Sequence, residues 1–261
     1  MWKLIPILLL LTACGATKTM PTNLASPQAT IQDNPMVTEL NDLKPLDGPV
    51  MTVGVYGFQD KTGQRKPAEN IANLSSAVTQ GAEVWVIDAL LQAGEGTWFE
   101  VVERVGMDNV IKERQLIRNT RTNYEKDDPT PLAPMKFAGI ILEGGIVGYD
   151  SNIATGGSGA RYFGIGAAAE YRIDTVTVAI RLVSVSSGRV LVSVAAEKSI
   201  ASYRSGADVF KFLDLGTKAL EVETGYSINE PTNYAVREAI EMAVIEMIYQ
   251  GANQNLWNFK P

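Results

Sequence analysis

The sequence predicts an α/β domain with α+β character, in which helices flank a mixed sheet, together with two β-hairpins outside that core. Three observations lead to this fold class. Apolar and polar residues alternate at 51–58 and 175–196, as in strands, and apolar residues recur at helical spacing at 233–250. Two further alternating stretches, 151–174 and 199–229, do not belong to this pattern of core elements.

The composition disfavours an enzyme and a nucleic-acid-binding protein. A chain of 261 residues with 46% hydrophobic residues can bury a sizeable core, but it contains no histidine. This removes the commonest general base and the usual zinc ligand, so we expect no catalytic site, no metal and no cofactor. The net charge of −6 argues against a surface for phosphate backbones.

The N-terminus predicts a lipoprotein signal peptide at 1–13. Lys3 precedes the apolar run Leu4–Leu11, which is too short to span a bilayer, and Cys14 is the single cysteine. The small residues before Cys14 resemble a bacterial lipobox, so we expect a covalent lipid on this residue. An ordinary signal peptide with a chance cysteine is the alternative. With Gly15 next, the expected address is the outer membrane, with the soluble part in the periplasm.

Residues 14–48 predict a lipidated N-terminal arm. Pro21, Pro27, Pro35 and Pro45 stand among polar residues without clear periodicity. Such a segment is either a tether or an arm that wraps around a folded domain.

The predicted periplasmic domain comprises 49–150, 175–198 and 230–261. Its elements are, in order, a strand at Met51–Phe58, a polar loop from Gln59 to about Asn73, a helix from Ser75 or Ser76 to Ala93 that ends at Gly94, a strand at Trp98–Val102, a helix from Gly106 to about Ile117, a strand at Ala138–Tyr149, a hairpin of 175–185 and 190–196 around the turn 186–188, and a helix from Thr232 or Asn233 to Gln250. On the last helix we expect Glu238, Glu241 and Glu246 on the polar side.

The glycine-rich stretch 151–174 is predicted to be the first transmembrane β-hairpin. Tyr162 stands where a dinucleotide fingerprint needs glycine, and Ile165 stands where a P-loop needs lysine, so both nucleotide interpretations fail. At a period of two, Phe163, Ile165 and Tyr171 share one face, which we assign to lipid. Glu170 and Arg172 share the other, which we assign to the barrel lumen.

The stretch 199–229 is predicted to be the second transmembrane hairpin. Val222 and Tyr226 alternate with Glu221 and Glu223, which gives a lipid face and a lumen face. A soluble antiparallel sheet with one wet face has the same period, so the pattern alone leaves both possibilities open. Four strands cannot close a barrel, so membrane hairpins from several copies would have to combine into one ring.

The chain resembles the CsgG family of curli secretion channels along its mature length after the arm. The resemblance is carried by Gln59-Asp60, Thr62-Gly63-Gln64 and Lys66-Pro67, by Trp98-Phe99, Glu103-Arg104 and Glu113-Arg114, by Glu143-Gly144 and Gly148-Tyr149, by the run from Gly159 to Gly166, and by Gly225-Tyr226, Asn229-Glu230-Pro231 and Leu256-Trp257.

This resemblance implies a homo-oligomeric outer-membrane ring, a nonamer in the family, in which each copy adds two hairpins to one transmembrane β-barrel. Unfolded curli subunits would pass through by diffusion, helped by a periplasmic adaptor and a surface accessory factor. The family's pore constriction maps onto Ala68, Glu69, Asn73 and Leu74. Ala68 or Glu69 stands where the family has tyrosine and Leu74 where it has phenylalanine, so we expect a narrow but less aromatic pore. A plain polar loop with one buried leucine is the alternative.

Two other functions are left open at this point. The first is a periplasmic lipoprotein that scaffolds an envelope assembly without forming a pore. The second, a hydrolase or nucleotide enzyme, is disfavoured because no cluster offers a nucleophile with a base or a set of metal ligands. Asp127-Asp128 is interpreted as a solvated surface loop.

Overall fold

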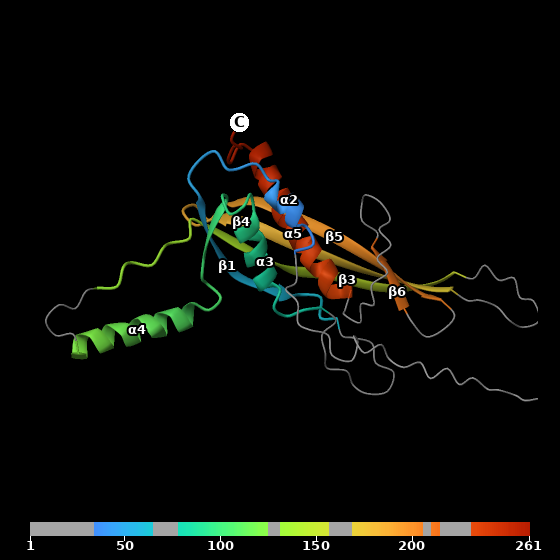
Figure 1. Ribbon diagram of the computed structural model, residues 1–261, viewed down its shortest axis with the longest axis horizontal. Helices are drawn as coiled ribbons and strands as arrows, with labels where there is room; N and C mark the ends of the chain where they lie inside the picture. Colours follow the sequence, from blue (N-terminus) through green and yellow to red (C-terminus); the bar gives the residue numbers. More distant parts are fainter. Residues whose placement is uncertain (1–33, 65–77, 125–130, 157–168, 206–209, 215–230) are drawn as a thin grey trace, which may run out of the picture. The chain divides into compact units, whose positions relative to one another are not determined.

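The computed structural model describes residues 34–64, 78–124, 131–156, 169–205, 210–214 and 231–261. Within these ranges the chain forms a six-stranded mixed sheet in the order β2-β1-β3-β4-β5-β6 (Figure 1). The strands are β1 (Met51–Asp60), β2 (Phe99–Val102), β3 (Ile140–Gly156), β4 (Ala169–Ser184), β5 (Val190–Ser205) and β6 (Phe210–Asp214). This is the mixed sheet with flanking helices that the sequence predicts.

The sheet has a parallel half and an antiparallel half. β1 runs parallel to both β2 and β3, which places the segment containing helix α3 (Glu83–Gln92) in a β-α-β crossover. β3, β4, β5 and β6 are antiparallel to their neighbours. The turn between β4 and β5 contains Gly188 at φ +67°, a conformation that glycine adopts without steric cost, as the predicted turn 186–188 requires.

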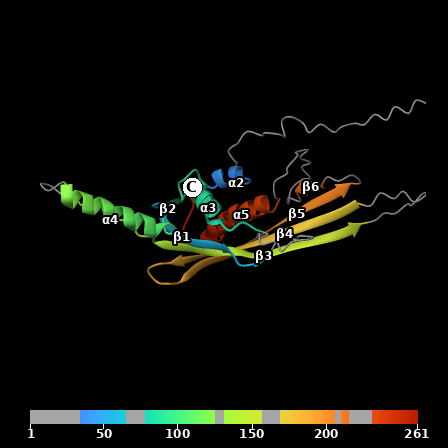
Figure 2. The same ribbon diagram turned by 90° about the horizontal axis from the view of Figure 1, so that it is seen from below.

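Helices cover one face of the sheet, as Figure 2 shows. α3 packs on β1 and β2, and α5 (Pro231–Asn253) packs on β4 and β5. The predicted apolar stripe of α5 is confirmed, because all six of its residues are buried: Val236, Ile240, Ala243, Val244, Met247 and Ile248. Burying aliphatic side chains of this size stabilises the fold by roughly 1.5–3 kcal/mol each.

The core continues into the C-terminal segment. The indole of Trp98 packs edge-on against Trp257 and Phe259, and its Nε1 donates to the carbonyl of Lys44 at 2.9 Å. Trp257 lies directly over Gly251, where an added Cβ would meet a ring carbon at 1.8 Å. The absence of a side chain at Gly251 is therefore what lets this indole close the end of α5.

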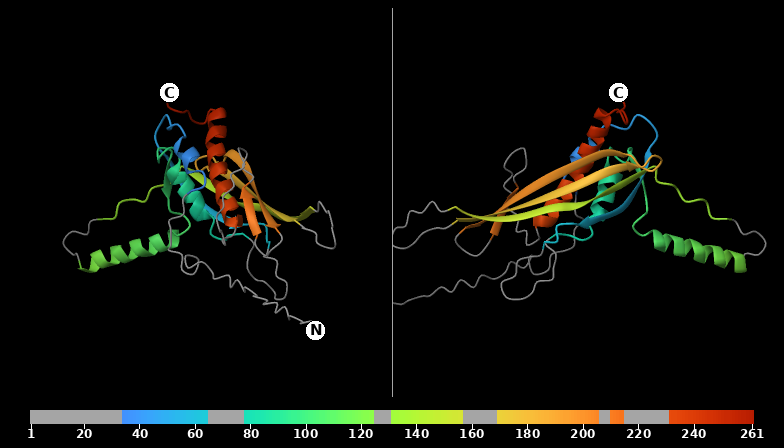
Figure 3. Two further views of the ribbon diagram at one scale, coloured as in Figure 1. Left: turned by 45° about the vertical axis from the view of Figure 1, so that its right-hand side comes forward. Right: turned by 180° about the vertical axis from the view of Figure 1, so that it is seen from behind.

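Helix α4 (Met107–Tyr124) extends beyond the predicted end near Ile117 and lies apart from the sheet (Figure 3). None of its residues is buried. Among the described elements no helix or strand packs extensively against it.

Helix α3 begins later than predicted. It starts at Glu83 with Ala82 at its N-cap, so the prediction of a cap at Ser75 or Ser76 is wrong. Gln80 explains the delay, because its Nε2 donates to Asp60 Oδ2 at 3.1 Å and to the carbonyl of Val78 at 3.2 Å, which holds residues 78–81 outside the helix.

Part of the predicted arm is folded. The short helix α2 (Val37–Asn41) packs on α3 and α5, and Leu40, Leu43 and Leu46 are buried. Residues 34–48 thus behave as a segment that wraps around the domain. Cys14 and the rest of the arm up to residue 33 lie outside the described residues.

Candidate functional site in the strand extension

Strands β3 to β6 continue as antiparallel pairs beyond the part of the sheet on which α5 packs. We call residues 151–156, 169–173, 201–205 and 210–214 the strand extension. Its pairing runs to Gly156 opposite Ala169, to Ala169 opposite Ser205 and to Arg204 opposite Phe210. β4 and β5 cross the predicted boundaries at 174/175 and 198/199 without a break.

The register places the candidate residues of β4 in cross-strand rows. Glu170 stands opposite Thr155 on β3 and opposite Arg204 on β5, and Tyr171 stands opposite Tyr203. Because successive strand residues alternate between faces, Glu170 and Arg172 occupy positions on one face and Tyr171 occupies a position on the other. Across β5, Phe210 of β6 falls in the same row as Glu170, and Phe212 falls in the same row as Arg172. β6 therefore places two aromatic residues at positions on the face that the alternation assigns to a polar lumen.

A belt of buried and half-buried polar groups lies at the base of the strand extension. Tyr149 donates its hydroxyl to buried Asp174 at 3.2 Å, and the hydroxyls of Thr175 and Ser199 are 2.8 Å apart. These contacts join β3, β4 and β5 where the strands leave the helix-covered core.

An ion pair attaches this belt to α5. Lys198 Nζ donates to Glu238 Oε1 at 2.7 Å, and both side chains are at least four-fifths buried. Removing one partner of such a pair costs about 3–5 kcal/mol, because the other charge is left uncompensated. Sequence reasoning missed Asp174 and Lys198, although both stand in phase with the buried residues of their strands, which is the signal that could have found them.

Asp60 joins the two ends of the predicted constriction loop. Its Oδ1 accepts from the backbone N–H of Thr62 at 2.8 Å and from the Thr62 hydroxyl at 2.6 Å, and its Oδ2 accepts from Gln80 at 3.1 Å. Partial burial alone would raise the pKa of Asp60, but these bonds together hold it below its ordinary value. We call this arrangement the Asp60 clasp.

Most predicted site residues lie outside the described ranges. This holds for Ala68, Glu69, Asn73 and Leu74 of the constriction, for Phe163 and Ile165 of the first hairpin, and for Glu221, Val222, Glu223 and Tyr226 of the second. Their assigned roles stay predictions.

A second buried charge cluster ties the arm to α5. Glu241 Oε2 accepts from the backbone N–H of Met36 at 2.7 Å, and Arg237 donates to Glu241 Oε1 at 3.1 Å and to the side chain of Asn34. Glu241 is 1% exposed, so its predicted place on the polar side of the helix is wrong. Burial raises the pKa of Glu241, although the bonds from Met36 and Arg237 oppose this effect.

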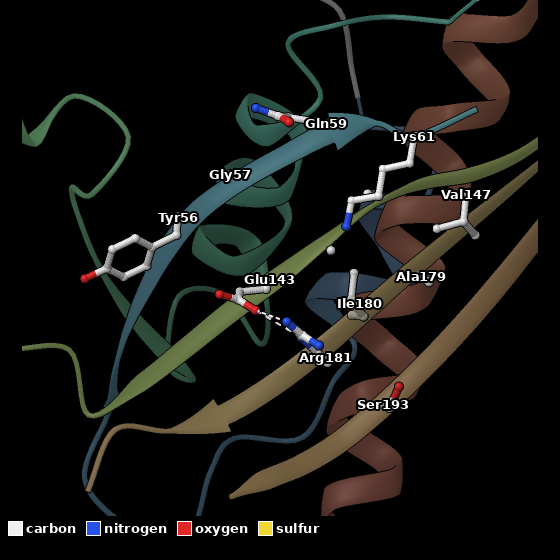
Figure 4. A pocket seen from close by; sticks show the side chains of 12 residues that line it. Tyr56, Gly57, Gln59, Lys61, Glu143, Val147, Ala179, Ile180, Arg181 and Ser193 are labelled. Carbon is white, nitrogen blue, oxygen red and sulfur yellow. Dashed lines mark hydrogen bonds and ion pairs between the residues drawn. The ribbon is translucent and has the colours of Figure 1, made fainter. Parts of the chain in front are cut away.

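The face of the sheet opposite α3 and α5 carries a shallow pocket of about 490 Å³ (Figure 4). Arg181 and Glu143 form an ion pair in it, with Nε 3.0 Å from the carboxylate, and the stem of Lys61 passes over Gly145. Tyr56 and Val147 are exposed at its margin. The pocket offers charge and hydrogen bonding without a paired nucleophile and base.

In the part of the chain that the structure describes, no group of three or more His, Cys, Asp or Glu is arranged to hold a metal ion. Among the same residues, no helix is long and apolar enough to cross a bilayer.

Comparison with known proteins identifies relatives across almost the whole chain. A family model described as "Curli production assembly/transport component CsgG" matches residues 37–261. The protein of that description from Escherichia coli (strain K12) is 40% identical over 230 residues, which cover 87% of this chain and 81% of that protein. The corresponding protein of Salmonella typhimurium (strain LT2) gives the same values.

Among solved structures, lipoprotein GNA1162 from Neisseria meningitidis superposes with a TM-score of 0.30 and 12% identity, over 78% of this chain and 99% of that one. At that score the superposition does not establish a shared fold. The sequence matches, by contrast, extend through the sheet, the strand extension and α5, and on these grounds the chain belongs to the CsgG family of curli production assembly/transport components.

Proposed function

We propose that the protein is a ring-shaped, oligomeric secretion channel of the outer membrane that exports unfolded curli subunits by diffusion through a narrow pore. The strand extension is the observation that carries this proposal, because β3, β4 and β5 continue in it beyond the layer of helices and β6 adds a fourth antiparallel strand there. Family membership supplies the role in curli assembly and transport.

The edges of the strand extension support an assembly of several copies. Ile146 is the last β3 residue that pairs with β1, so within the described part of the chain β3 pairs only with β4 beyond it. β6 is the other edge. Unpaired backbone groups in lipid cost several kcal/mol each, so hairpins from neighbouring copies would complete the sheet, in a nonamer if the family's ring number applies.

The remaining candidate residues take defined roles in this proposal. A lipid on Cys14 anchors the arm, and Ala68, Glu69, Asn73 and Leu74 line the constriction. Glu170, Arg172, Glu221 and Glu223 line the lumen, whereas Phe163, Ile165, Tyr171, Val222 and Tyr226 face lipid. The partners are further copies of the chain, unfolded curli subunits, a periplasmic adaptor and a surface accessory factor.

Planar-bilayer recordings with detergent-purified protein test the proposal. We expect discrete conductance steps from the wild type. In the Asn73→Ala/Leu74→Ala variant we expect a larger step, because shorter side chains at a constriction widen it. An Asp108→Ala variant, altered on helix α4, is the control and should conduct like the wild type. If the wild type opens no channels, the protein is not a pore, and a scaffold of an envelope assembly becomes the better interpretation.

A further inference from the structure

Helix α4 and the chain that follows it enclose a basic groove. Its lining includes Ile111, Arg114, Arg118 and Arg121 from α4, and Leu132 and Met135 from the returning segment, around a volume of about 410 Å³. Arg114 holds the two walls together by donating to the carbonyl of Ala133 at 2.6 Å. We call this feature the arginine groove. It combines apolar walls with three guanidinium groups on one face of the helix.

The outer face of α3 presents the complementary chemistry. Val84 and Leu91 are 55% and 51% exposed, although this helix buries Val86, Ala89 and Leu90 on its other face. Asp88 lies between the two at helical spacing with its side chain 46% exposed, and its Oδ2 is 3.9 Å from Arg237 Nη2 of α5 in the same chain. Exposed Glu95 follows the end of the helix. We call Val84, Asp88, Leu91 and Glu95 the acidic stripe.

The two surfaces match in charge and in length. Residues 78–97 contain three acids, Glu83, Asp88 and Glu95, and no Lys or Arg, whereas α4 carries four Lys or Arg against two acids, a balance of +2. Val84 and Leu91, like Ile111 and Arg118, are separated by seven helical rises, which is about 10.5 Å along the axis. Within one chain α3 and α4 do not pack extensively against each other.

We propose that the arginine groove of one copy receives the acidic stripe of α3 from a neighbouring copy. An amphipathic helix in an apolar groove with paired charges is a common recognition mode. The two contact surfaces differ, so the contact is head-to-tail, and a head-to-tail contact closes into a ring when its rotation allows. This inference rests on the proposed assembly of copies and names the surfaces that join them.

Charge reversal and apolar disruption test the contact. We compare Arg118→Glu and Leu91→Arg with the wild type by light scattering of detergent-purified protein. We expect the monomer fraction of each variant to rise at least about tenfold, because each change sets like charges opposite one another at the interface, which costs several kcal/mol. Lys112→Glu, on another face of α4, and Val185→Arg, in an exposed turn, are the matched controls and should assemble normally. Circular dichroism checks that each variant is folded.

Chemical cross-linking gives a second measurement that does not depend on loss of assembly. A bismaleimide should link Leu91→Cys/Ile111→Cys protein into a ladder beyond the dimer, whereas the wild type, which contains Cys14 alone, and the variants with only one of the two substitutions should give no ladder. Intact assembly of Arg118→Glu and Leu91→Arg, together with no ladder, would overturn this inference while leaving the channel proposal in place. A monomeric wild type would overturn both.

Discussion

The carboxyl of Glu241 is the most deeply buried acid of α5, and its setting makes stability depend on pH. Below its ordinary pKa of about 4.5 the group is neutral in the folded and the unfolded chain. Because burial raises the pKa in the folded state, ionisation on raising the pH costs more in the fold than in the unfolded chain. The stability contribution of the neutral form is therefore lost as pH rises through the raised pKa.

We expect the Glu241→Gln variant to gain stability relative to the wild type as pH rises from about 4 to about 8. Glutamine keeps an acceptor for Met36 and Arg237 but carries no charge. Urea unfolding followed by circular dichroism gives the two free energies of unfolding. Glu246→Gln is the control, since the Glu246 side chain accepts a hydrogen bond from Gln250, one turn further along the same helix. A constant difference between Glu241→Gln and the wild type over this range would contradict the expectation.

At the scale of single residues, the sequence predicts apolar burial better than polar burial. The buried stripe of α5 could be predicted from the sequence, because apolar residues at helical spacing lie on one face of a helix and that face packs on the core. Glu241 and Lys198 could not be placed so simply, because a charged residue in phase with a core stripe is buried only if partners from other elements meet it. Met36 for Glu241 and Glu238 for Lys198 come from other elements, whereas Arg237 lies one turn before Glu241 on the same helix.

At the scale of elements, the Asp60 clasp joins the two ends of the predicted constriction loop through hydrogen bonds to Thr62 and Gln80. Replacing Asp60 with alanine removes the acceptor shared by Thr62 and Gln80. A bond of this kind contributes about 1 kcal/mol at a partly exposed site, so we expect the Thr62 amide to exchange with solvent several-fold to tenfold faster. Hydrogen exchange measured by mass spectrometry, on the peptide containing Thr62, checks this.

The same clasp should resist acid. Because the pKa of Asp60 is lowered in the fold, its carboxylate contributes fully to stability above its ordinary pKa of 3.8. This stability is lost only as pH falls through the lower pKa of the folded state. Asp108→Ala, on α4, is the control and should leave exchange at Thr62 unchanged. Unaltered exchange in Asp60→Ala would show that the clasp does not hold the loop ends.

The helices show why element boundaries were harder to predict than element types. The sequence signals a serine cap before α3, but Gln80 is bound by Asp60, and the helix starts only at Glu83. α4 continues past Ile117 through polar residues that carry no apolar period, so the pattern that predicts the helix cannot mark its end. α2 was missed because five residues are too few to show a helical period.

For the whole molecule, the proposed membrane face can be tested by charge. We expect Phe163→Lys/Ile165→Glu protein to stay out of the outer membrane, because a charge facing lipid costs about 2–4 kcal/mol near the bilayer midplane. Fractionation of cells, with bilayer recordings of whatever protein is recovered, measures the effect. Val185→Lys, in the exposed turn between β4 and β5, is the control.

Normal insertion and assembly of the Phe163/Ile165 variant would argue strongly against the membrane assignment of the first hairpin. The sheet order, the parallel β1–β3 pairing and the covering of one face by α3 and α5 would be unaffected by that result. The residue periods predict the strands and helices of this mixed sheet, but they do not give the strand order, which the tertiary pairing of the strands sets.

The unbroken course of β4 and β5 has a consequence for the order of folding. Sixteen-residue strands that begin in the strand extension or end in it cannot slip there without slipping in the core, where Val176, Val178, Val192 and Val194 are buried. The helix-covered half can therefore fold first and set the alignment of the strand extension in advance. In the proposed channel, the strand extension would then reach the bilayer with its lumen and lipid positions already fixed, so insertion would not have to select the register.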